Sequence, residues 1–266
     1  MKAIIPIAGL GTRLLPFSKV IPKAMLPVHD KPSVQWIVEE LEAAGISDVV
    51  FVYSKGQEIV EEYFSEHSWY DDELRARGKG EEADALEKIR KLASFHFVRQ
   101  AEQKGDGHAI LQARELFADD EAFLVVFGDC LYTGEKVVER MVNLYKKVDR
   151  TVLAVQEVEP AEVIHYGIIE PHEEVDDFVI STFVEKPLPA EAPSNLAIIG
   201  RYLLTGSIWK FLEAERAESG EIRLIDALNL MHQQEEIHGI RLNGIWLDTG
   251  TLEGLQRAGE VLRGAG

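Results

Sequence analysis

The chain has 266 residues, 46% of them hydrophobic, a size and composition typical of a folded α/β protein and not of a disordered chain. Its net charge of −18, from 28 basic and 46 acidic residues, argues against a nucleic-acid or membrane partner, because both bind clustered Lys and Arg. No apolar run approaches the roughly 20 residues that span a bilayer, no signal peptide is recognisable, and the single cysteine, Cys130, excludes an intrachain disulfide, so we expect a cytoplasmic protein.

In the first half, apolar runs of strand length alternate with helical patterns. Strands are expected at 2–7, 48–53, 95–99, 122–127 and 151–158. Helices are expected at 33–44, 57–64, 108–116 and 135–147. This alternation predicts an α/β fold with a Rossmann-like, mixed and mostly parallel sheet that helices cover on both faces.

The second half is less regular and predicts a small antiparallel part. Strands are expected at 166–170 and 178–185, a further apolar run spans 196–204, and a closing helix is expected at 251–262. A highly charged segment at 71–91 indicates an exposed helical insertion, for which a solvated surface is the simplest explanation.

The segment after the first strand contains Gly9 and Gly11 but does not match a dinucleotide-binding fingerprint. In G-x-G-x-x-G the third glycine lies in a helix, whereas here Leu14 takes that place and three prolines follow before residue 28. The P-loop pattern G-x-x-x-x-G-K-[ST] is also absent. A hydride-transfer enzyme is therefore disfavoured.

The same segment is suited to lie against phosphate groups. Glycines let backbone N–H groups approach phosphate oxygens, and Arg13 and Lys23 add positive charge in a chain that is otherwise strongly acidic. Two glycines alone would be explained as well by a tight turn with exposed basic residues. The length of the patterned string, from Gly9 to Val28, favours the phosphate site.

The string resembles the signature of the bacterial-type UTP–glucose-1-phosphate uridylyltransferases, or UDP-glucose pyrophosphorylases, within the sugar nucleotidyltransferase family. Residues 9–16, GLGTRLLP, and 21–28, IPKAMLPV, match this signature. Further segments match in the same order along the chain, at 31–32, 98–100, 104–109, 184–187, 192–197, 200–202 and 220–227. The charged insertion favours the uridylyl branch of the family over the thymidylyl branch.

The resemblance implies a nucleotidyltransferase fold of the GT-A-like type and a fixed order of parts. We expect a single domain over 1–250, with a nucleotide-binding half at 1–135, a sugar-binding half at 136–250 and a helical insertion at 68–94. A C-terminal helix would follow at 251–266. The implied reaction joins UTP and glucose-1-phosphate into UDP-glucose and pyrophosphate with Mg²⁺ as cofactor, in a homodimer or homotetramer.

The resemblance also implies the residues of the site. Arg13, Lys23, Asp129 and Lys186 would be catalytic, and the metal would be held by Asp129, which ends an apolar strand, together with Asp248. The nucleotide would contact Ala8, Gly9, Gly11, Thr12, Gln100 and Gly107. The sugar would contact Gly167, Glu185, Lys186 and Asn195.

Some positions depart from the family pattern and keep alternatives open. Ala24 stands where Glu or Gln is usual, and Asp106 stands where an apolar residue is usual. The segment 246–251 resembles the thymidylyl branch more closely, so dTTP competes with UTP as substrate. A non-catalytic nucleotide-sugar sensor on the same scaffold is the alternative from another class. The retained Arg13, Lys23, Asp129 and Lys186 argue against such a sensor.

Overall fold

The computed structural model describes residues 1–65, 69–173, 175–218 and 220–264. Residue 68, the first of the predicted insertion, and residues 265–266, the last of the predicted C-terminal helix, lie outside this set, as do residues 174 and 219 within the predicted sugar-binding half. In the part of the chain that is described, no helix has the length and apolar character needed to cross a membrane.

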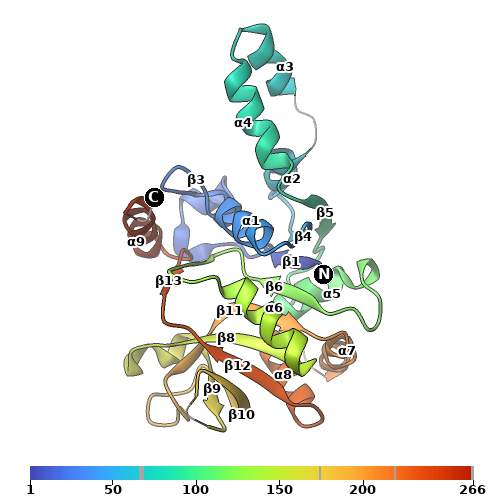
Figure 1. Ribbon diagram of the computed structural model, residues 1–266, viewed down its shortest axis with the longest axis vertical. Coiled ribbons are helices and arrows are strands. Elements are labelled where there is room, and N and C mark those ends of the chain that lie inside the picture. Colours follow the sequence, from blue (N-terminus) through green and yellow to red (C-terminus); the bar gives the residue numbers. More distant parts are fainter. Residues whose placement is uncertain (66–68, 174, 219, 265–266) are drawn as a thin grey trace.

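The N-terminal half builds four parallel strands at one end of a nine-stranded sheet (Figure 1). Their order is β5 (Ser94–Arg99), β4 (Asp48–Tyr53), β1 (Ala3–Pro6) and β6 (Phe123–Val126). All four residues of β6 are buried, which is typical of a parallel strand covered on both faces. The carboxyl ends of these strands meet at one edge, where ligands of open α/β sheets bind.

The sheet continues beyond β6 with mostly antiparallel pairing. The further order is β11 (Leu196–Leu204), β8 (Thr151–Glu157), β12 (Ile237–Arg241), β10 (Asp177–Glu185) and β9 (Gly167–Pro171), in which only β8 and β12 run parallel. The predicted mixed α/β fold is confirmed, with parallel pairing concentrated in the N-terminal half. Of these strands, β12 was not predicted from the sequence.

Helices cover both faces of the sheet and enclose two apolar cores. One core packs beneath α1 (Ser33–Ala43), α2 (Ile59–Phe64), α6 (Val137–Val148) and α9 (Leu252–Arg263). The other packs beneath α5 (Asp106–Gln112), α7 (Ile208–Glu218) and α8 (Leu224–His232). Strand side chains alternate between the two cores, as Ile4 and Ile5 do, because successive residues of a strand face opposite sides. Each such buried aliphatic side chain contributes about 1.5–3 kcal/mol to stability.

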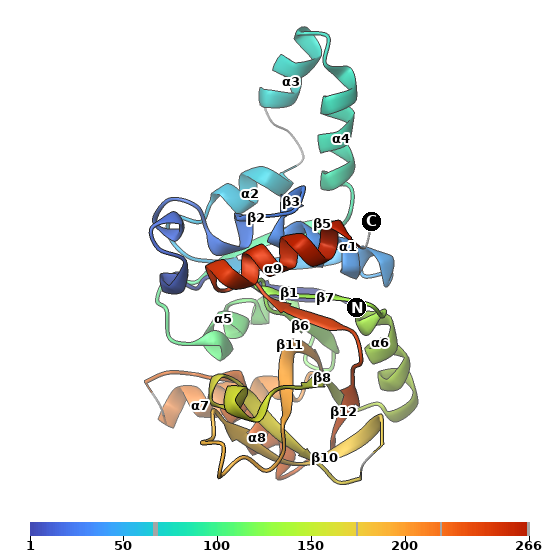
Figure 2. The same cartoon turned by 90° about the vertical axis from the view of Figure 1, so that its left-hand side faces the viewer.

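Two helices of the charged insertion, α3 (Trp69–Ala76) and α4 (Gly80–Arg90), form an arm that projects away from the sheet (Figures 1 and 2). Arg90 Nη2 lies 2.9 Å from Asp71 Oδ2, and both side chains are buried between the two helices. The arm is thus held together by its own contacts and leaves the carboxyl edge of the sheet open.

The remaining elements are short and bring the end of the chain back to the sheet edge. An antiparallel ribbon pairs β7 (Cys130–Thr133) with β13 (Ile245–Asp248), and α9 follows with Thr251 as its N-cap. Strands β2 (Pro27–Val28) and β3 (Lys31–Pro32) form a small hairpin. Single turns of 3-10 helix lie at Thr12–Leu14, Phe17–Lys19, Lys23–Met25 and Arg114–Leu116, with a longer one at Pro160–His165.

Candidate active site

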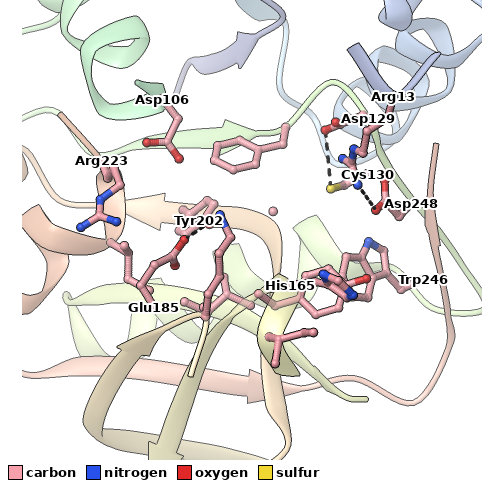
Figure 3. Close-up of a pocket in the computed structure, with 18 of the residues that line it drawn as sticks. Arg13, Asp106, Asp129, Cys130, His165, Glu185, Tyr202, Arg223, Trp246 and Asp248 are labelled. Carbon is pink, nitrogen blue, oxygen red and sulfur yellow. Dashed lines mark hydrogen bonds and ion pairs between the residues drawn. The ribbon is translucent and has the colours of Figure 1, made fainter. Parts of the chain in front are cut away.

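Two adjoining cavities lie at the carboxyl edge of the parallel strands. The larger, of about 560 Å³, extends toward β9 and β10 and is drawn in Figure 3. The smaller, of about 440 Å³, lies between the glycine-containing loop and α5. Four residues line both cavities: Asp106, Phe127, Asp129 and Glu221. The shared wall means that one extended ligand can occupy both spaces.

The glycines of the N-terminal loop make room for Lys23. A Cβ on Gly9 would lie 3.5 Å from Lys23 Nζ, and one on Gly11 would lie 3.3 Å from Lys23 Cβ. Gly11 also has φ of 64°, a left-handed conformation that glycine adopts without strain. Ala8, Gly9 and Lys23 line the smaller cavity, whereas Gly11 and Thr12, which were also expected to contact the nucleotide, do not line either cavity. The loop is therefore built around the lysine side chain.

Asp129 lies where the two cavities meet and forms an ion pair with Lys23. Lys23 Nζ is 2.5 Å from Asp129 Oδ2, and both side chains are largely buried. Burial alone would raise the pKa of Asp129, but the charge and hydrogen bond of Lys23, with a contribution from Arg13, hold that pKa below its ordinary value. Asp129 is therefore ionised at neutral pH.

Asp248 lies beside Asp129 because β13 pairs with β7, in a register that places Asp248 opposite Cys130. Thr249 fixes this arrangement: its backbone N–H and its hydroxyl both donate to the Asp129 carbonyl, at 2.7 and 2.9 Å. Arg13 Nη1 lies 3.9 Å from Asp248 Oδ2 (Figure 3). Burial first, and then the charge of Asp129, raise the pKa of Asp248.

The space beside Gly250 indicates that the two carboxylates can share a cation. A Cβ built on Gly250 would lie 2.9 Å from Asp248 Oδ1, 3.2 Å from Asp129 Oδ2 and 2.7 Å from Arg13 Nη2. Two carboxylate oxygens thus face one small space that only a glycine leaves open. Within the described residues no group of three or more His, Cys, Asp or Glu side chains could hold a metal by itself. The pair fits Mg²⁺, which takes one or two carboxylates and completes its shell with substrate phosphates and water.

Amide side chains surround the smaller cavity. Gln100 is buried and donates to the Gly105 carbonyl at 3.2 Å, while Gln103 donates to the Ala8 carbonyl at 2.6 Å. Gln103 was not predicted from the sequence. Gly107 does not line either cavity; it lets α5 pack closely, because a Cβ there would meet the Ile222 side chain and carbonyl at 3.0 Å.

Ala24 lies away from the cavities. It is fully buried in the core, and a Cβ on Gly128 would be 3.7 Å from the Ala24 methyl group. Ala24 therefore packs against Gly128 in the core and lines neither cavity.

The predicted sugar-side residues gather at the far end of the larger cavity. Gly167 in β9 is paired with Glu185 in β10, and a Cβ on Gly167 would lie 3.3 Å from Glu185 Oε2. Lys186 Nζ lies 3.2 Å from Glu185 Oε1. Asn195 instead lines a neighbouring cavity behind Tyr166 and Trp246, where its amide donates to the Val158 carbonyl at 3.1 Å.

Several residues of the larger cavity were not predicted as site residues. Tyr166 and Trp246 form an edge-to-face pair with ring centroids 4.7 Å apart, and this pair forms part of the wall. Burial, with contributions from nearby acidic groups, raises the pKa of Tyr166 to about 12, so its hydroxyl stays protonated. Tyr202 and Arg223, which are labelled in Figure 3, also line the cavity, as does Glu221. The last three lie within motifs that carry the family resemblance, which was the available signal for them.

A buried ion pair supports the site from behind. Arg201 has no exposed surface and donates to both carboxylate oxygens of Glu40, at 3.0 and 2.5 Å, and to the Cys130 carbonyl at 3.0 Å. These bonds join β11, α1 and the residue that follows Asp129. Cys130 itself is buried, and burial with the charge of Asp129 raises the pKa of its thiol, so it is not a nucleophile.

Comparison with known proteins agrees with this geometry. The family model described as "Nucleotidyl transferase" matches residues 2–263, so the chain belongs to that family and is a nucleotidyltransferase. A UTP–glucose-1-phosphate uridylyltransferase of Staphylococcus saprophyticus is 41% identical over 255 residues, covering 94% of this chain and 87% of that protein. The resemblance found in the sequence is thereby confirmed.

Two solved structures are similar over nearly the whole chain. The UTP-bound UGPase of Acinetobacter baumannii has a TM-score of 0.91 at 31% identity and covers 98% of this chain and 92% of its own. A UDP-glucose pyrophosphorylase complexed with UDP-glucose has a TM-score of 0.87 at 34% identity and covers 100% of this chain and 99% of its own. The fold of the chain is thus shared with these proteins.

Proposed function

We propose that the protein transfers a uridylyl group from UTP to glucose-1-phosphate and releases pyrophosphate, making UDP-glucose. The observation that carries the proposal is the convergence of Lys23, Asp129, Arg13 and Asp248 where two cavities meet. One cavity is lined by amide groups and the other by Glu185 and Lys186. The names of the relatives, which specify UTP, glucose-1-phosphate and UDP-glucose, support the choice of substrates.

The smaller cavity is assigned to the nucleotide. The amide nitrogens of Gln100 and Gln103 are each engaged by two protein groups, which leaves the side-chain carbonyl oxygens as acceptors that suit the ring N–H of uracil. Gly9 allows the triphosphate to approach the loop, and Lys23 provides the positive charge beside it. The larger cavity is assigned to the sugar phosphate, with Lys186 facing the phosphate and Glu185 accepting hydrogen bonds from sugar hydroxyls.

The chemistry needs positioning and charge neutralisation and no side-chain nucleophile. An oxygen of glucose-1-phosphate, already an anion, attacks the α-phosphorus of UTP in line, and the bond to pyrophosphate breaks. Arg13 and Lys23 neutralise charge on the triphosphate, and Lys186 holds the attacking phosphate. Mg²⁺ held by Asp129 and Asp248 would neutralise the phosphate oxygens further. Once phosphates are bound, Lys23 can exchange its contact with Asp129 for one with phosphate.

The remaining parts of the proposal concern the whole protein. Residues 1–135 and 136–250 are taken as the nucleotide-binding and sugar-binding halves of one domain, with the arm at 68–94 as an insertion and 251–266 as a C-terminal helix. We place the protein in the cytoplasm as a homodimer or homotetramer. Transfer from dTTP, and a non-catalytic role in binding nucleotide sugars, are the competing functions.

The test is a matrix of nucleotides against sugar-1-phosphates, with pyrophosphate release as the measured quantity and Mg²⁺ in excess. UTP with glucose-1-phosphate should give the highest kcat/KM. A higher value with dTTP would replace the uridylyl assignment by the thymidylyl one. Binding of UDP-glucose in a calorimetric titration, with no turnover in any pairing, would show a sensor.

A further inference from the structure

Asp106 occupies a position that belongs to both cavities. It is the first residue of α5 and one of the four residues that line the smaller and the larger cavity together. In Figure 3 its carboxylate lies on the side of Arg223 and Tyr202, across the larger cavity from Asp129 and Asp248.

The Asp106 side chain is held in a fixed orientation. Its Oδ1 accepts hydrogen bonds from the Gly107 N–H at 2.7 Å and from the Leu224 N–H at 2.9 Å. Both of these hydrogen bonds end on Oδ1. Among the described residues this leaves Oδ2 as the oxygen that can accept from a ligand. Gly105 reinforces the position, because a Cβ there would lie 2.3 Å from the Ile222 carbonyl and push α5 away. A carboxylate fixed by backbone groups loses little conformational entropy when it binds a ligand.

The chemistry of the position limits what Asp106 can recognise. Burial raises the pKa of Asp106, and the backbone N–H groups of Leu224 and Gly107 oppose this rise. In its ionised form the carboxylate only accepts hydrogen bonds, so it selects a donor. Glu185 is a charged neighbour of Asp106, so a second anionic group directly beside the Asp106 carboxylate is disfavoured, although Lys186 and Arg223 line the same cavity. A neutral hydroxyl group is a donor that the carboxylate can bind without adding a charge.

The order of groups in the nucleotide indicates that a ribose hydroxyl lies there. With the base between Gln100 and Gln103 and the α-phosphate beside Lys23 and Asp129, the ribose must lie between them. Asp106 lines the same cavity and directly follows Gly105, whose carbonyl accepts from Gln100, so it lies near the end assigned to the base. A carboxylate that accepts from a ribose 2′-hydroxyl is a known way to recognise ribonucleotides in other folds.

We propose that Asp106 is a specificity-determining residue that accepts a hydrogen bond from the ribose 2′-hydroxyl of the nucleotide and so selects ribonucleotides over deoxyribonucleotides. This inference rests on the proposed function, because it takes a nucleoside triphosphate to occupy the smaller cavity. It also gives a physical reason to favour UTP over dTTP, since dTTP lacks the 2′-hydroxyl and would leave a buried carboxylate oxygen without its donor.

The test compares UTP with dUTP, because these two nucleotides differ only at the 2′ position. The measured quantity is the ratio of kcat/KM for UTP to kcat/KM for dUTP with glucose-1-phosphate. Since both values come from one preparation, the ratio is insensitive to partial unfolding of a variant. The wild-type chain should prefer UTP by at least about tenfold, and Asp106→Leu should reduce the preference to within about twofold.

Two further variants separate recognition from folding. Asp106→Ser keeps a side-chain oxygen that can accept the backbone N–H groups but is too short to reach the ribose, so it should lose the preference as Leu does. Asp120→Asn, an exposed carboxylate outside both cavities, should keep the wild-type ratio.

The outcomes distinguish this inference from the proposed function. No turnover by the wild-type chain with any nucleotide would contradict the proposed function itself. Turnover with an unchanged UTP-to-dUTP ratio in both Asp106 variants would overturn only the present inference. A changed preference between glucose-1-phosphate and 2-deoxyglucose-1-phosphate, with the nucleotide ratio intact, would overturn it as well and place Asp106 against the sugar.

Discussion

Lys23 and Asp129 form an ion pair of 2.5 Å between the glycine loop and the end of β6. The two residues are separated by 106 positions in the chain, and the Lys23 and Asp129 side chains are only 18% and 16% exposed. The lysine lowers the pKa of a carboxylate that burial alone would raise. The pair therefore keeps Asp129 ionised and places positive charge where the triphosphate is proposed to bind.

Replacing Lys23 by Met should impair catalysis more than folding. The variant loses the charge beside the triphosphate and leaves Asp129 buried with less compensation, so kcat/KM should fall by about 10²–10³. The pKa of Asp129 should rise, which steady-state rates measured against pH would detect. Lys19→Met is the matched control, because Lys19 is an exposed lysine of the same loop. A Lys23→Met enzyme within twofold of wild type would remove Lys23 from the mechanism.

Replacing Gly250 by Ala should weaken the use of Mg²⁺ and also displace the Arg13 guanidinium, because the added Cβ would lie 2.7 Å from Arg13 Nη2. The added methyl group would lie about 3 Å from carboxylate oxygens of both Asp129 and Asp248 and fill the space proposed for the ion. We expect the Mg²⁺ concentration for half-maximal activity to rise at least about tenfold. Gly80→Ala, where a Cβ meets nothing within 4 Å, serves as control. An unchanged Mg²⁺ requirement would mean that the ion, if used, binds elsewhere.

Replacing Asp248 by Asn should stabilise the protein at neutral pH while reducing activity. Burial, with the charge of Asp129, raises the pKa of Asp248, so the folded state binds this proton more tightly than the unfolded state does. The ionised carboxylate therefore costs stability above its folded pKa, and this cost disappears as pH falls below the unfolded value of about 3.9.

The expected gain for Asp248→Asn is about 1 kcal/mol at pH 7, since active-site groups are often kept at the expense of stability. Urea unfolding curves at pH 7 and near pH 4 measure it, and the gain should be smaller at the lower pH. A variant that is less stable than wild type at pH 7 would contradict this view of the Asp129–Asp248 pair.

Replacing Arg201 by Met should destabilise the fold by about 3 kcal/mol. The substitution leaves the Glu40 carboxylate and the Cys130 carbonyl without the guanidinium that binds both. The Glu40 carboxylate, left without its partner, should then cause most of the loss of stability. The double variant Arg201→Met, Glu40→Gln should therefore recover part of the stability. Urea unfolding measures both variants, and additive losses in the double variant would argue against the pair as a coupled unit.

Local patterns were sufficient to predict much of the fold. The strand expected at 48–53 and the helix expected at 33–44 coincide with β4 and nearly with α1, because a buried parallel strand and an amphipathic helix each have a strong periodic signal. The ribbon of β7 and β13 was not predicted. Each strand has four residues, and their partners lie more than 100 positions apart, so nothing local specifies the pairing.

The sequence could predict those site residues that fall in sequence motifs, but not the contacts that depend on how distant segments pair. Lys23, Asp129, Gly167 and Glu185 fall in sequence motifs, and the structure places all four on the cavity walls or against residues that line them. The closeness of Asp248 to Asp129 depends on the register of the ribbon, which sequence spacing does not determine. The position of Ala24 could not be predicted from the sequence, because its burial in the core depends on how the loop packs against Gly128.

The most direct measurement is ³¹P NMR of UTP, glucose-1-phosphate and Mg²⁺ incubated with the protein. The account predicts that the diphosphate signals of UDP-glucose and the signal of free pyrophosphate appear together in equal amounts, and that Asp129→Asn slows their appearance by orders of magnitude. Loss of UTP to inorganic phosphate without UDP-glucose, or an Asp129→Asn enzyme as fast as wild type, would contradict it.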